Sequence, residues 1–527
     1  MKFEDLLVET GGFGRFQILI LATLCLTRIN LPMHFLLHNF LAATPSHRCA
    51  IPHQEAFVNL TVEEVLLISI PRKPDGTFSS CEMFSQPQFH LLLNSSLQPE
   101  NKSIVQPCQH GWVYDRSQFT STISTQWDLV CEQRGLNQAT ATFFFIGVTI
   151  GAVVFGYLSD RFGRKSMLQL SLVCSMVFGM LSAASVSYTM LAITRTLTGV
   201  ALSGLSLIVL PLGMEWVDIQ HRTFIGILIS IFWSVGNMLL ALAAYLVREW
   251  HWLLVAVTGP CLLSIICLWW VPESARWLIA KGKVKQAHRH LLTCARMNGR
   301  KDFAVSTEVR RNYSCISLFR TPVLRKISLC SGVVWFGVAF SYYGMSMNLT
   351  GFGLSIYLSQ FVFGIIEIPA KIVMYWLVNR VGRRQSQAWT LILAGLPVLC
   401  VGGLNLLSSY TWNFLPRVAT VGKGFSEAAF TTVFLYTSEL YPTILRQNGM
   451  GYTSFMARLG GALAPLVFLL DEVWRSLPEV TYCSVAVCSG AVAFLLPETL
   501  NVRLPEGIED VEKPHAPEGV PLQALLK

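Results

Sequence analysis

The sequence predicts an all-α membrane protein whose twelve transmembrane helices form two six-helix halves. Of the 527 residues, 52% are hydrophobic and only 13% are charged, and the mean hydropathy is +0.49, which lies on the apolar side of soluble domains. Apolar runs of about 20 residues, the length of a helix that crosses a bilayer, recur along the chain. Short motifs in the first half also recur in the second half.

The apolar runs define the predicted spans in order. The first run begins too late, and lacks the basic start and small-residue cleavage site, to be a removable signal peptide. We expect helices at 14–39, 138–159, 166–187, 190–213, 222–246, 250–271, 328–347, 352–378, 386–405, 413–436, 444–470 and 476–496.

The basic loops predict the orientation, because loops rich in Lys and Arg stay on the cytoplasmic side. The segments "SDRFGRK" and "NRVGRR" are basic, and the linker 272–327 carries thirteen Lys and Arg against three acids. All three are predicted to be cytoplasmic. The helical halves are then 14–271 and 328–496, and the cytoplasmic termini are 1–13 and 497–527. The net charge of +9 therefore reflects topology and does not indicate nucleic-acid binding.

One large loop, 40–137, is predicted to lie outside the cell. It holds four of the fourteen cysteines, an even set in an oxidising place, which predicts two disulfides. Four cysteines can pair in three ways, and the sequence does not choose among these pairings. The loop also holds three N-x-[ST] glycosylation acceptors. The cysteines are Cys49, Cys81, Cys108 and Cys131, and the acceptors are Asn59, Asn94 and Asn101.

Three signatures repeat at a nearly constant offset. Gly163 in "SDRFGRK" and Gly382 in "VNRVGRR" are 219 residues apart, Glu215 and Glu439 are 224 apart, and the prolines of "VPESARW" and "LPETL" are 225 apart. These repeats predict two equivalent halves. They also bring acids and bases to the cytoplasmic ends of helices.

We expect these charges to form ion pairs between the halves that close the inside mouth and part when it opens. The alternative is that they are solvated loop charges that contribute little each. The gating candidates are Asp160, Arg161, Arg164, Glu215, Arg222, Glu273, Arg380, Arg383, Glu439, Arg446 and Glu498.

Seven ionisable residues fall within the predicted spans, where a charge is costly and marks a functional site by default. Two pairs are four residues apart, Glu367 with Lys371 and Lys423 with Glu427, so each pair is expected to neutralise itself on one helix face. Pro369 predicts a bend in the eighth helix. The other three are Arg28, Arg195 and Arg458.

Five cations against two acids predict a positive interior. Arg458 is followed by small residues that allow close helix approach, and its guanidinium can fork onto a carboxylate or sulfate, so we expect it to bind the ligand. Arg28 and Arg195 are open to a structural interpretation, paired across helices or snorkelling to the interface.

Aromatic side chains supply the other part of a pocket for organic ions. Flat rings around a fixed cation suit an amphipathic aromatic anion, although each ring alone is also typical of lipid packing. His34 and His38 are one helical turn apart, and a proton-coupling role is the less favoured interpretation. Besides Arg458 and Lys371, the substrate-binding candidates are Trp233, Trp335, Tyr342, Tyr343, Phe430, Phe434, Ser454, His34 and Phe35.

The sequence contains no Walker A motif, no H-E-x-x-H and no C-x-x-C. We therefore expect neither nucleotide-driven pumping nor metal catalysis, and predict a protein that is not an enzyme and has no cofactor or metal.

The stretches "GYLSDRFGRK", "WWVPESARWL" and "TSELYPTILRQ" resemble signatures of the major facilitator superfamily, and specifically of its organic ion transporter family, solute carrier family 22. The resemblance covers nearly the whole chain. It implies that the eleventh-helix arginine of the anion branch falls on Arg458 and the eighth-helix lysine on Lys371, both associated with anion or chloride binding. The cation branch has an aspartate where Arg458 stands.

The resemblance also implies pocket roles for the aromatic residues of helices seven and ten. Two positions depart from the family pattern, because Trp233 replaces a fifth-helix tyrosine and Phe35 replaces a first-helix asparagine found in some members. These departures bear on the substrate range and leave the charge argument unchanged. The implied pocket residues are Trp335, Tyr342, Tyr343, Phe430 and Phe434.

The expected function is polyspecific secondary transport of small organic anions across the plasma membrane by alternating access, as exchanger or facilitator. The expected substrates are carboxylates, sulfate conjugates and nucleotide-like anions, with chloride or a dicarboxylate as candidate counter-ion. The resemblance also implies a functional monomer in the basolateral membrane. One alternative is an organic cation or zwitterion carrier, which the acidic residue Glu367 would support. Another is a receptor or scaffold that does not transport.

Overall fold

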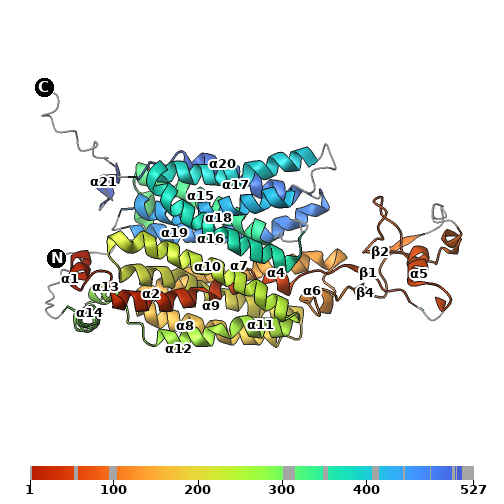
Figure 1. The fold of residues 1–527 in the computed structure, drawn as a ribbon, viewed down its shortest axis with the longest axis horizontal. Helices are drawn as coiled ribbons and strands as arrows, with labels where there is room; N and C mark the ends of the chain where they lie inside the picture. Colours follow the sequence, from red (N-terminus) through yellow and green to blue (C-terminus); the bar gives the residue numbers. More distant parts are fainter. Residues whose placement is uncertain are drawn as a thin grey trace, which may run out of the picture.

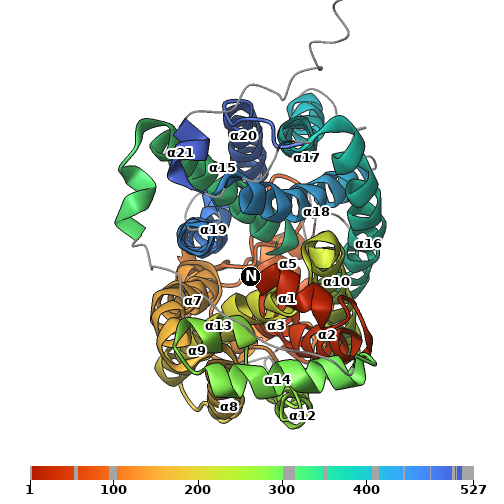
Figure 2. The same ribbon diagram turned by 90° about the vertical axis from the view of Figure 1, so that its left-hand side faces the viewer.

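The long helices of the computed structural model run side by side and divide into two groups, which Figure 1 shows as lower and upper halves. Figure 2 looks along the helices and shows the same two groups. The structure describes residues 3–52, 57–93, 104–300, 315–347, 354–405, 415–442, 445–474, 476–500, 502, 505 and 507–512.

The first half contains six predicted spans. Its helices are α2 (Arg15–Arg28), α3 (Asn30–Phe35), α4 (His38–Leu41), α7 (Arg134–Phe162), α8 (Arg164–Ala183), α9 (Tyr188–Glu215), α10 (Arg222–Leu246), α11 (Trp250–Thr258) and α12 (Pro260–Leu268). Two of the spans are built from shorter helices. The first span consists of α2, α3 and α4, and the sixth consists of α11 and α12.

The second half contains the other six. Its helices are α15 (Pro322–Met347), α16 (Ile356–Val381), α17 (Arg383–Asn405), α18 (Leu415–Leu440), α19 (Arg446–Val467) and α20 (Leu477–Ala493). Among the described residues, nine helical stretches are long and apolar enough to cross a membrane, and α17, α18 and α20 lie beside them in the bundle. The predicted fold class, a membrane protein of twelve helices in two halves, is confirmed.

Two predicted spans are interrupted. Pro260 has no backbone N–H to donate, and it begins α12 after α11 has ended at Thr258. The first span breaks after Arg28, where the Asn30 amide donates to the Thr27 carbonyl at 3.2 Å and to Ser264 Oγ at 2.7 Å. The hydrogen bond to Ser264 links the break in the first span to α12.

The loop between the first two spans forms a small unit at the end of the bundle opposite α1 (Phe3–Glu9) and α21 (Ile508–Glu512) (Figure 1). Cys49 is bonded to Cys108, and Cys81 to Cys131, which is one of the three possible connectivities. Strand β1 (His47–Cys49) pairs antiparallel with β4 (Trp112–Tyr114), and β2 (Glu82–Phe84) pairs with β3 (Val105–Pro107). The helices of the unit are α5 (Val62–Ser69) and α6 (Ile123–Gln126).

Of the three glycosylation candidates, Asn59 is exposed on this unit. Asn94 and Asn101 lie outside the described residues. Glycosylation at all three therefore stays a prediction.

The linker between the halves is fastened to the first half. It contains α13 (Ala275–Ala280) and α14 (Val284–Met297). The Asn298 amide donates to Gln17 Oε1 at 2.9 Å and to the Thr10 carbonyl at 3.2 Å, and its oxygen accepts from the Phe16 N–H at 3.2 Å. Burial raises the pKa of the Cys294 thiol, so this side chain stays neutral, and it accepts a hydrogen bond from the Gln17 amide of α2 at 3.3 Å. At the other end of the chain, α21 (Ile508–Glu512) packs on α15.

The disulfide pairing predicts a specific peptide map. Non-reducing digestion and mass spectrometry of the purified chain should give one linked peptide containing Cys49 and Cys108 and another containing Cys81 and Cys131. The double variant Cys81→Ser/Cys131→Ser should keep the first linkage and lower the free energy of unfolding of the loop by about 2–5 kcal/mol. Cys488→Ser, which removes an exposed free cysteine, serves as the control and should change neither. A linked peptide joining Cys49 to Cys81 or Cys131 would contradict the fold.

Candidate functional site

The four buried charges of α16 and α18 are paired between the helices. Lys371 Nζ lies 2.7 Å from Glu427 Oε1, and Lys423 Nζ lies 3.2 Å from Glu367 Oε1, with all four side chains at most 5% exposed. The prediction that each pair neutralises itself within one helix is wrong. The four-residue spacing places both charges of a helix on the face toward its neighbour, so each lysine reaches the opposite carboxylate.

Both Glu367 oxygens have further partners. The Tyr342 hydroxyl donates to Oε1 at 3.0 Å, and Ser234 Oγ donates to Oε2 at 2.8 Å. The Trp233 indole N–H donates in turn to the Tyr342 hydroxyl at 2.8 Å. Because Trp233 and Ser234 belong to α10, the first half supplies part of the shell around a carboxylate of the second half.

The two lysines are also held on more than one side. Lys371 Nζ donates to Ser234 Oγ at 2.8 Å and to the Ser230 carbonyl at 2.5 Å. Lys423 Nζ donates to Ser346 Oγ at 2.5 Å and lies 3.1 Å from the centroid of the Tyr342 ring. A buried ion pair persists only where the remaining polar atoms are satisfied, and these contacts satisfy them. The four charges form a neutral, fully connected group.

Arg458 differs from these lysines, because it has no carboxylate partner among the described residues. Its guanidinium donates to Ser206 Oγ of α9 and lies 5.5 Å from the centroid of the Phe35 ring. The Tyr343 hydroxyl is within hydrogen-bonding reach, and Arg458 Nε has no described partner. The side chain thus spans the interface between the halves with hydrogen-bonding capacity left over.

Arg28 lies in the same region and was not among the substrate-binding candidates. Its guanidinium lies 5.3 Å from the centroid of the Trp233 ring, and its Nε has no described partner. It is near enough to Arg458 for the two charges to repel. Of the two structural interpretations left open by the sequence, pairing across helices finds no carboxylate partner among the described residues, and snorkelling stays untested. The signal that could have found Arg28 in the sequence is an arginine within a span and without a nearby acid. Arg195 shows the same signal, so the sequence alone does not separate the two residues.

Arg195 lies within the first half. It is 2% exposed, donates to the His34 carbonyl at 3.3 Å and lies 4.4 Å from the centroid of the Phe144 ring. The His34 and His38 side chains are buried beside it. These contacts are with α3, α4 and α7, and a proton-coupling role for the histidines stays a prediction.

The aromatic candidates form one continuous group of rings around the charges. Tyr343 lies 4.9 Å from Phe145 and 6.1 Å from Phe35, centroid to centroid, so this side joins the halves. Within the second half the centroid distances are 5.4 Å for Tyr342 and Phe430, 5.9 Å for Phe430 and Phe434, and 4.7 Å for Trp335 and Phe434. Ser454 is half-buried on α19, one turn before Arg458.

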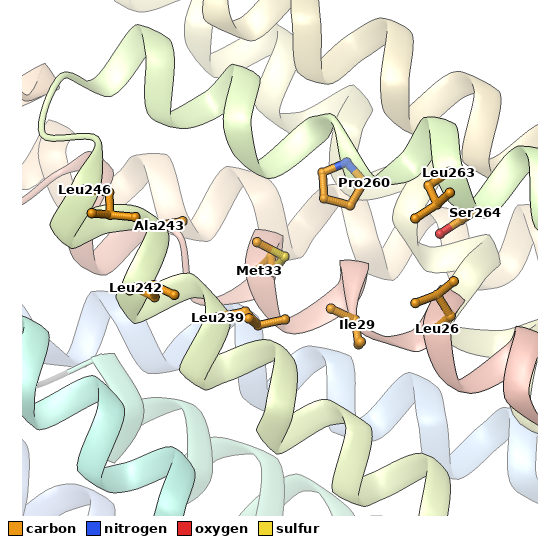
Figure 3. Close-up of a pocket in the computed structure, with 10 residues that line it drawn as sticks. All are labelled: Leu26, Ile29, Met33, Leu239, Leu242, Ala243, Leu246, Pro260, Leu263 and Ser264. Atoms are coloured by element: carbon orange, nitrogen blue, oxygen red, sulfur yellow. The ribbon is translucent and has the colours of Figure 1, made fainter.

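A separate pocket of about 370 Å³ opens between the helices of the first half (Figure 3). Its lining contains no charged side chain, and Leu242, Leu246 and Leu263 are more than half exposed on the bundle surface. Such a lining suits hydrocarbon and offers nothing to an anion. The lining residues are Leu26, Ile29, Met33, Leu239, Leu242, Ala243, Leu246, Pro260, Leu263 and Ser264.

The gating candidates form two equivalent clusters at the end of the bundle near the termini. In the first half, Arg164 pairs with Asp160 at 2.6 Å and lies 3.6 Å from Glu215. Glu273 accepts from the backbone N–H groups of Arg164 and Lys165 at 2.9 and 3.0 Å.

In the second half, the Arg383 guanidinium donates two hydrogen bonds to the Glu439 carboxylate, at 3.0 and 3.2 Å. The Glu498 carboxylate accepts hydrogen bonds from the backbone N–H groups of Arg383 and Arg384 at 2.8 and 3.2 Å. Gly163 and Gly382 precede the two arginines with φ of 106° and 107°. The geometry of the clusters therefore repeats along with their sequence.

These ion pairs lie within each half, and among the described residues none of the gating candidates pairs across the halves in this state. Pairing between the halves when the inside mouth closes stays a prediction. Each arginine stands at the start of a helix, and its glutamate ends the next helix packed against it, so the repeat builds each cluster independently. Arg161 and Arg380 are exposed and lie over the Phe162 and Trp376 rings. Arg222 is half-buried at the start of α10, and the Arg446 side chain lies outside the described residues.

The crossed pairing predicts which substitutions compensate. Lys371→Met should leave Glu427 buried without a cation and cost about 3–5 kcal/mol of stability. Adding Glu427→Leu should restore most of the lost melting temperature of the protein purified in detergent. Adding Glu367→Leu instead is the matched control, and it should lower the melting temperature further. Rescue by Glu367→Leu would show that the pairs form within each helix.

The repeated glycines predict a second set of stability changes. A Cβ added at Gly382 would lie 2.7 Å from Glu498 Oε2 in a backbone conformation that L side chains rarely adopt, and Gly163 faces Glu273 in the same way. Gly163→Ala and Gly382→Ala should each cost about 1–3 kcal/mol, measured as a lower melting temperature. Gly451→Ala is the control, because an added Cβ there meets nothing within 4 Å and removes glycine from a helix. Equal behaviour of all three variants would refute this account.

Comparisons with known proteins agree with this architecture. The family model described as Major Facilitator Superfamily matches residues 126–465. The solved structure of the proton:xylose symporter XylE bound to 6-bromo-6-deoxy-D-glucose superimposes with a TM-score of 0.57 at 16% identity, covering 94% of this chain and 98% of that chain. At this identity the likeness shows the fold alone.

Relatives at higher identity define the family more narrowly. Solute carrier family 22 member 7 of Homo sapiens is 53% identical, covering 98% of this chain and 97% of the relative. The same member from Rattus norvegicus is 51% identical over 97% of this chain and 98% of the relative, and member 6-B of Xenopus laevis is 39% identical over 98% and 95%. The stretches "HFLL", "SAASVSY", "AITRTLTG" and "FSEAAFTT" indicate the same likeness to member 7.

These matches confirm the resemblance predicted from the motifs, and they identify a multi-pass membrane carrier, not an enzyme. The chain belongs to the major facilitator superfamily and, within it, to solute carrier family 22.

Proposed function

We propose that the protein is a secondary transporter of small organic anions that works by alternating access. The observation that carries this proposal is the charge balance at the centre. Lys371 and Lys423 are neutralised by the two buried glutamates, whereas Arg28 and Arg458 have no described carboxylate partner. A bound anion would supply the missing negative charge between two arginines that come from different halves.

The rings around these arginines support an anion with an apolar or aromatic body. Trp233 and Phe35 lie under the guanidinium groups, and Tyr343 offers a hydroxyl beside Arg458. Arginine can bind a carboxylate or sulfate through two parallel hydrogen bonds. We therefore propose carboxylates, sulfate conjugates and nucleotide-like anions as substrates, with Arg28, Arg458 and the aromatic group as their contacts.

The contacts between halves support alternating access. Among the described residues, the polar contacts between the halves lie at the centre and toward the disulfide-bonded loop. Near the loop, Arg134 pairs with Asp471, Asn39 donates to the Ser346 carbonyl at 2.9 Å, and Tyr357 donates to the Gln118 carbonyl at 2.9 Å. We infer a state closed toward the loop, and rocking of the two halves about the centre would reverse it.

We place the loop outside the cell, and both termini and the linker in the cytoplasm, because basic loops stay inside. The proposed location is the plasma membrane, basolateral in epithelia, with the monomer as the working unit. Chloride or a dicarboxylate is the proposed counter-ion for exchange.

The alternative of a cation carrier rests on Glu367, and the contacts of that residue weaken it. Both carboxylate oxygens are already engaged by Lys423, Tyr342 and Ser234. A cation would have to displace these partners beside two arginines that have no carboxylate partner among the described residues. The alternative of a receptor that does not transport predicts binding without uptake.

The test of the substrate charge is uptake into cells that express the chain, with labelled dicarboxylates, sulfate conjugates, nucleotides and organic cations as the panel. Arg458→Asp should reduce anion uptake at least about 30-fold, because the loss of a buried charge partner costs 2 kcal/mol or more. Arg458→Lys is the charge-preserving control and should keep part of the uptake. Surface biotinylation must show equal amounts of each variant. Anion uptake that survives Arg458→Asp would overturn the site.

The test of exchange uses the same cells preloaded with an unlabelled dicarboxylate. Preloading should accelerate uptake of the labelled anion if the protein is an exchanger. Equal rates with and without preloading would assign a facilitator, and selective uptake of cations would overturn the proposal.

A further inference from the structure

The linker carries a basic surface that transport as proposed above does not use. It consists of six exposed side chains on α14 and its two flanks, which we name the α14 basic surface: Lys281, Lys283, Lys285, Arg289, Arg296 and Arg300. The sequence from Ser274 to Arg300 contains no Asp or Glu. The positive charge is thus concentrated over one short stretch of the chain.

These charges are not neutralised by other parts of the protein. In the described ranges of the chain, none of the six residues forms an ion pair, in contrast to Arg164 and Arg383 at the starts of α8 and α17. Lys283 lies over the Trp277 ring at 5.5 Å, which leaves its charge intact. Burial and the nearby Lys165 lower the pKa of His290, so the positive charge comes from side chains that stay charged at physiological pH.

The surface lies where a membrane interface would be. Figure 1 shows α14 end-on just beyond the bundle, and Figure 2 shows it lying across the first half, below α13 and near α8 and α12. Trp269 and Trp270 follow α12 directly and are 74% and 81% exposed. Exposed tryptophans at the end of a membrane helix are typical of the headgroup region. The Lys165 ammonium donates to the Trp269 carbonyl at 3.2 Å, which links this level to the start of α8.

The surface is held rigidly. Ala287, Leu291, Cys294 and Ala295 are buried on the opposite side of α14, and Asn298 fastens the end of the helix to α2. The basic side chains therefore keep a fixed position relative to the bundle. A preformed site loses less conformational entropy on binding than a flexible basic tail.

We propose that the α14 basic surface binds the headgroups of anionic phospholipids in the leaflet at this end of the bundle. Phosphate groups match its charge, and a cluster of Lys and Arg at the membrane surface is a recognised way to bind anionic lipids. The assignment of this leaflet as cytoplasmic rests on the orientation proposed above. Bound headgroups fix the first half and its linker to the membrane surface.

The apolar residues beside the charges favour a lipid over a soluble polyanion. Val284 and Met297 are 37% and 41% exposed on the same helix, and Trp269 and Trp270 are exposed at the end of α12. These side chains gain by entering the acyl boundary, and a soluble anion offers them no such contact. A lipid satisfies the charged and the apolar parts of the surface together.

The experiment titrates the full chain, purified in a neutral detergent, with short-chain phosphatidylinositol bisphosphate while its melting temperature is followed. The lipid should raise the melting temperature, and short-chain phosphatidylcholine should not. Lys283→Gln/Lys285→Gln/Arg289→Gln should weaken the apparent affinity roughly 100-fold, since each basic side chain near an anionic surface contributes about 1 kcal/mol.

Two variants serve as controls. Arg72→Gln/Lys73→Gln/Arg116→Gln removes three exposed charges from the disulfide-bonded loop and should titrate like the parent. Lys283→Arg/Lys285→Arg/Arg289→Lys keeps the charge and should restore the affinity. The melting temperatures without lipid show whether each variant is folded.

Three outcomes would overturn the proposal. The parent shows no shift with the anionic lipid, the glutamine variant on α14 titrates like the parent, or inositol trisphosphate without acyl chains shifts the melting temperature as well as the lipid does. Uptake measured in parallel separates this proposal from the transport function. Lipid binding without anion uptake would refute only the function, and uptake without lipid binding would refute only the lipid site.

Discussion

The pairing of buried charges between α16 and α18 is the constraint on which the rest of the centre depends. Two lysines and two glutamates cannot stay in a membrane interior unless each has a partner and its remaining polar atoms are satisfied. The crossed pairs meet this requirement with distances of 2.7 and 3.2 Å. They also draw in Tyr342, and through it Trp233 of the first half. The neutral group thus connects both halves of the protein.

Because the lysines and glutamates of α16 and α18 neutralise one another, these acids are not available to balance the buried arginines. With the lysines satisfied, Arg28 and Arg458 are charges at the interface between the halves whose balance the described residues leave open, and Arg195 within the first half also has no described carboxylate partner. Arg28 and Arg458 belong to opposite halves, so an anion held between them would bind both moving parts at once. Substrate recognition and the closure of the two halves would then use the same contacts, and rocking of the halves would break and remake them.

The two ends of the bundle differ in how they hold the halves together. Near the disulfide-bonded loop, Arg134 of α7 reaches Asp471 beyond α19, and this contact joins the halves. Near the termini, Arg164 and Arg383 each stay with a glutamate of their own half. The repeated clusters therefore fix the helix ends within each half, while the linker helix α14 fastens the first half through Asn298. At the end of the bundle with these repeated clusters, the described ion pairs therefore leave the two halves unlinked.

The membrane class, the twelve helices, the repeat and the carrier family could be predicted from the sequence, because apolar length, basic loops and repeated motifs are local properties of the chain. The sequence also identified Arg458 as an unusual cation. The partners of the buried charges became visible in the three-dimensional fold, since the distance between side chains on neighbouring helices is not encoded in sequence spacing. Spacing alone paired Glu367 with Lys371, whereas packing of α16 against α18 pairs Lys371 with Glu427. In the same way, packing brought Arg28 beside Arg458 and kept Arg383 with Glu439, because only helices in contact bring their charges within reach.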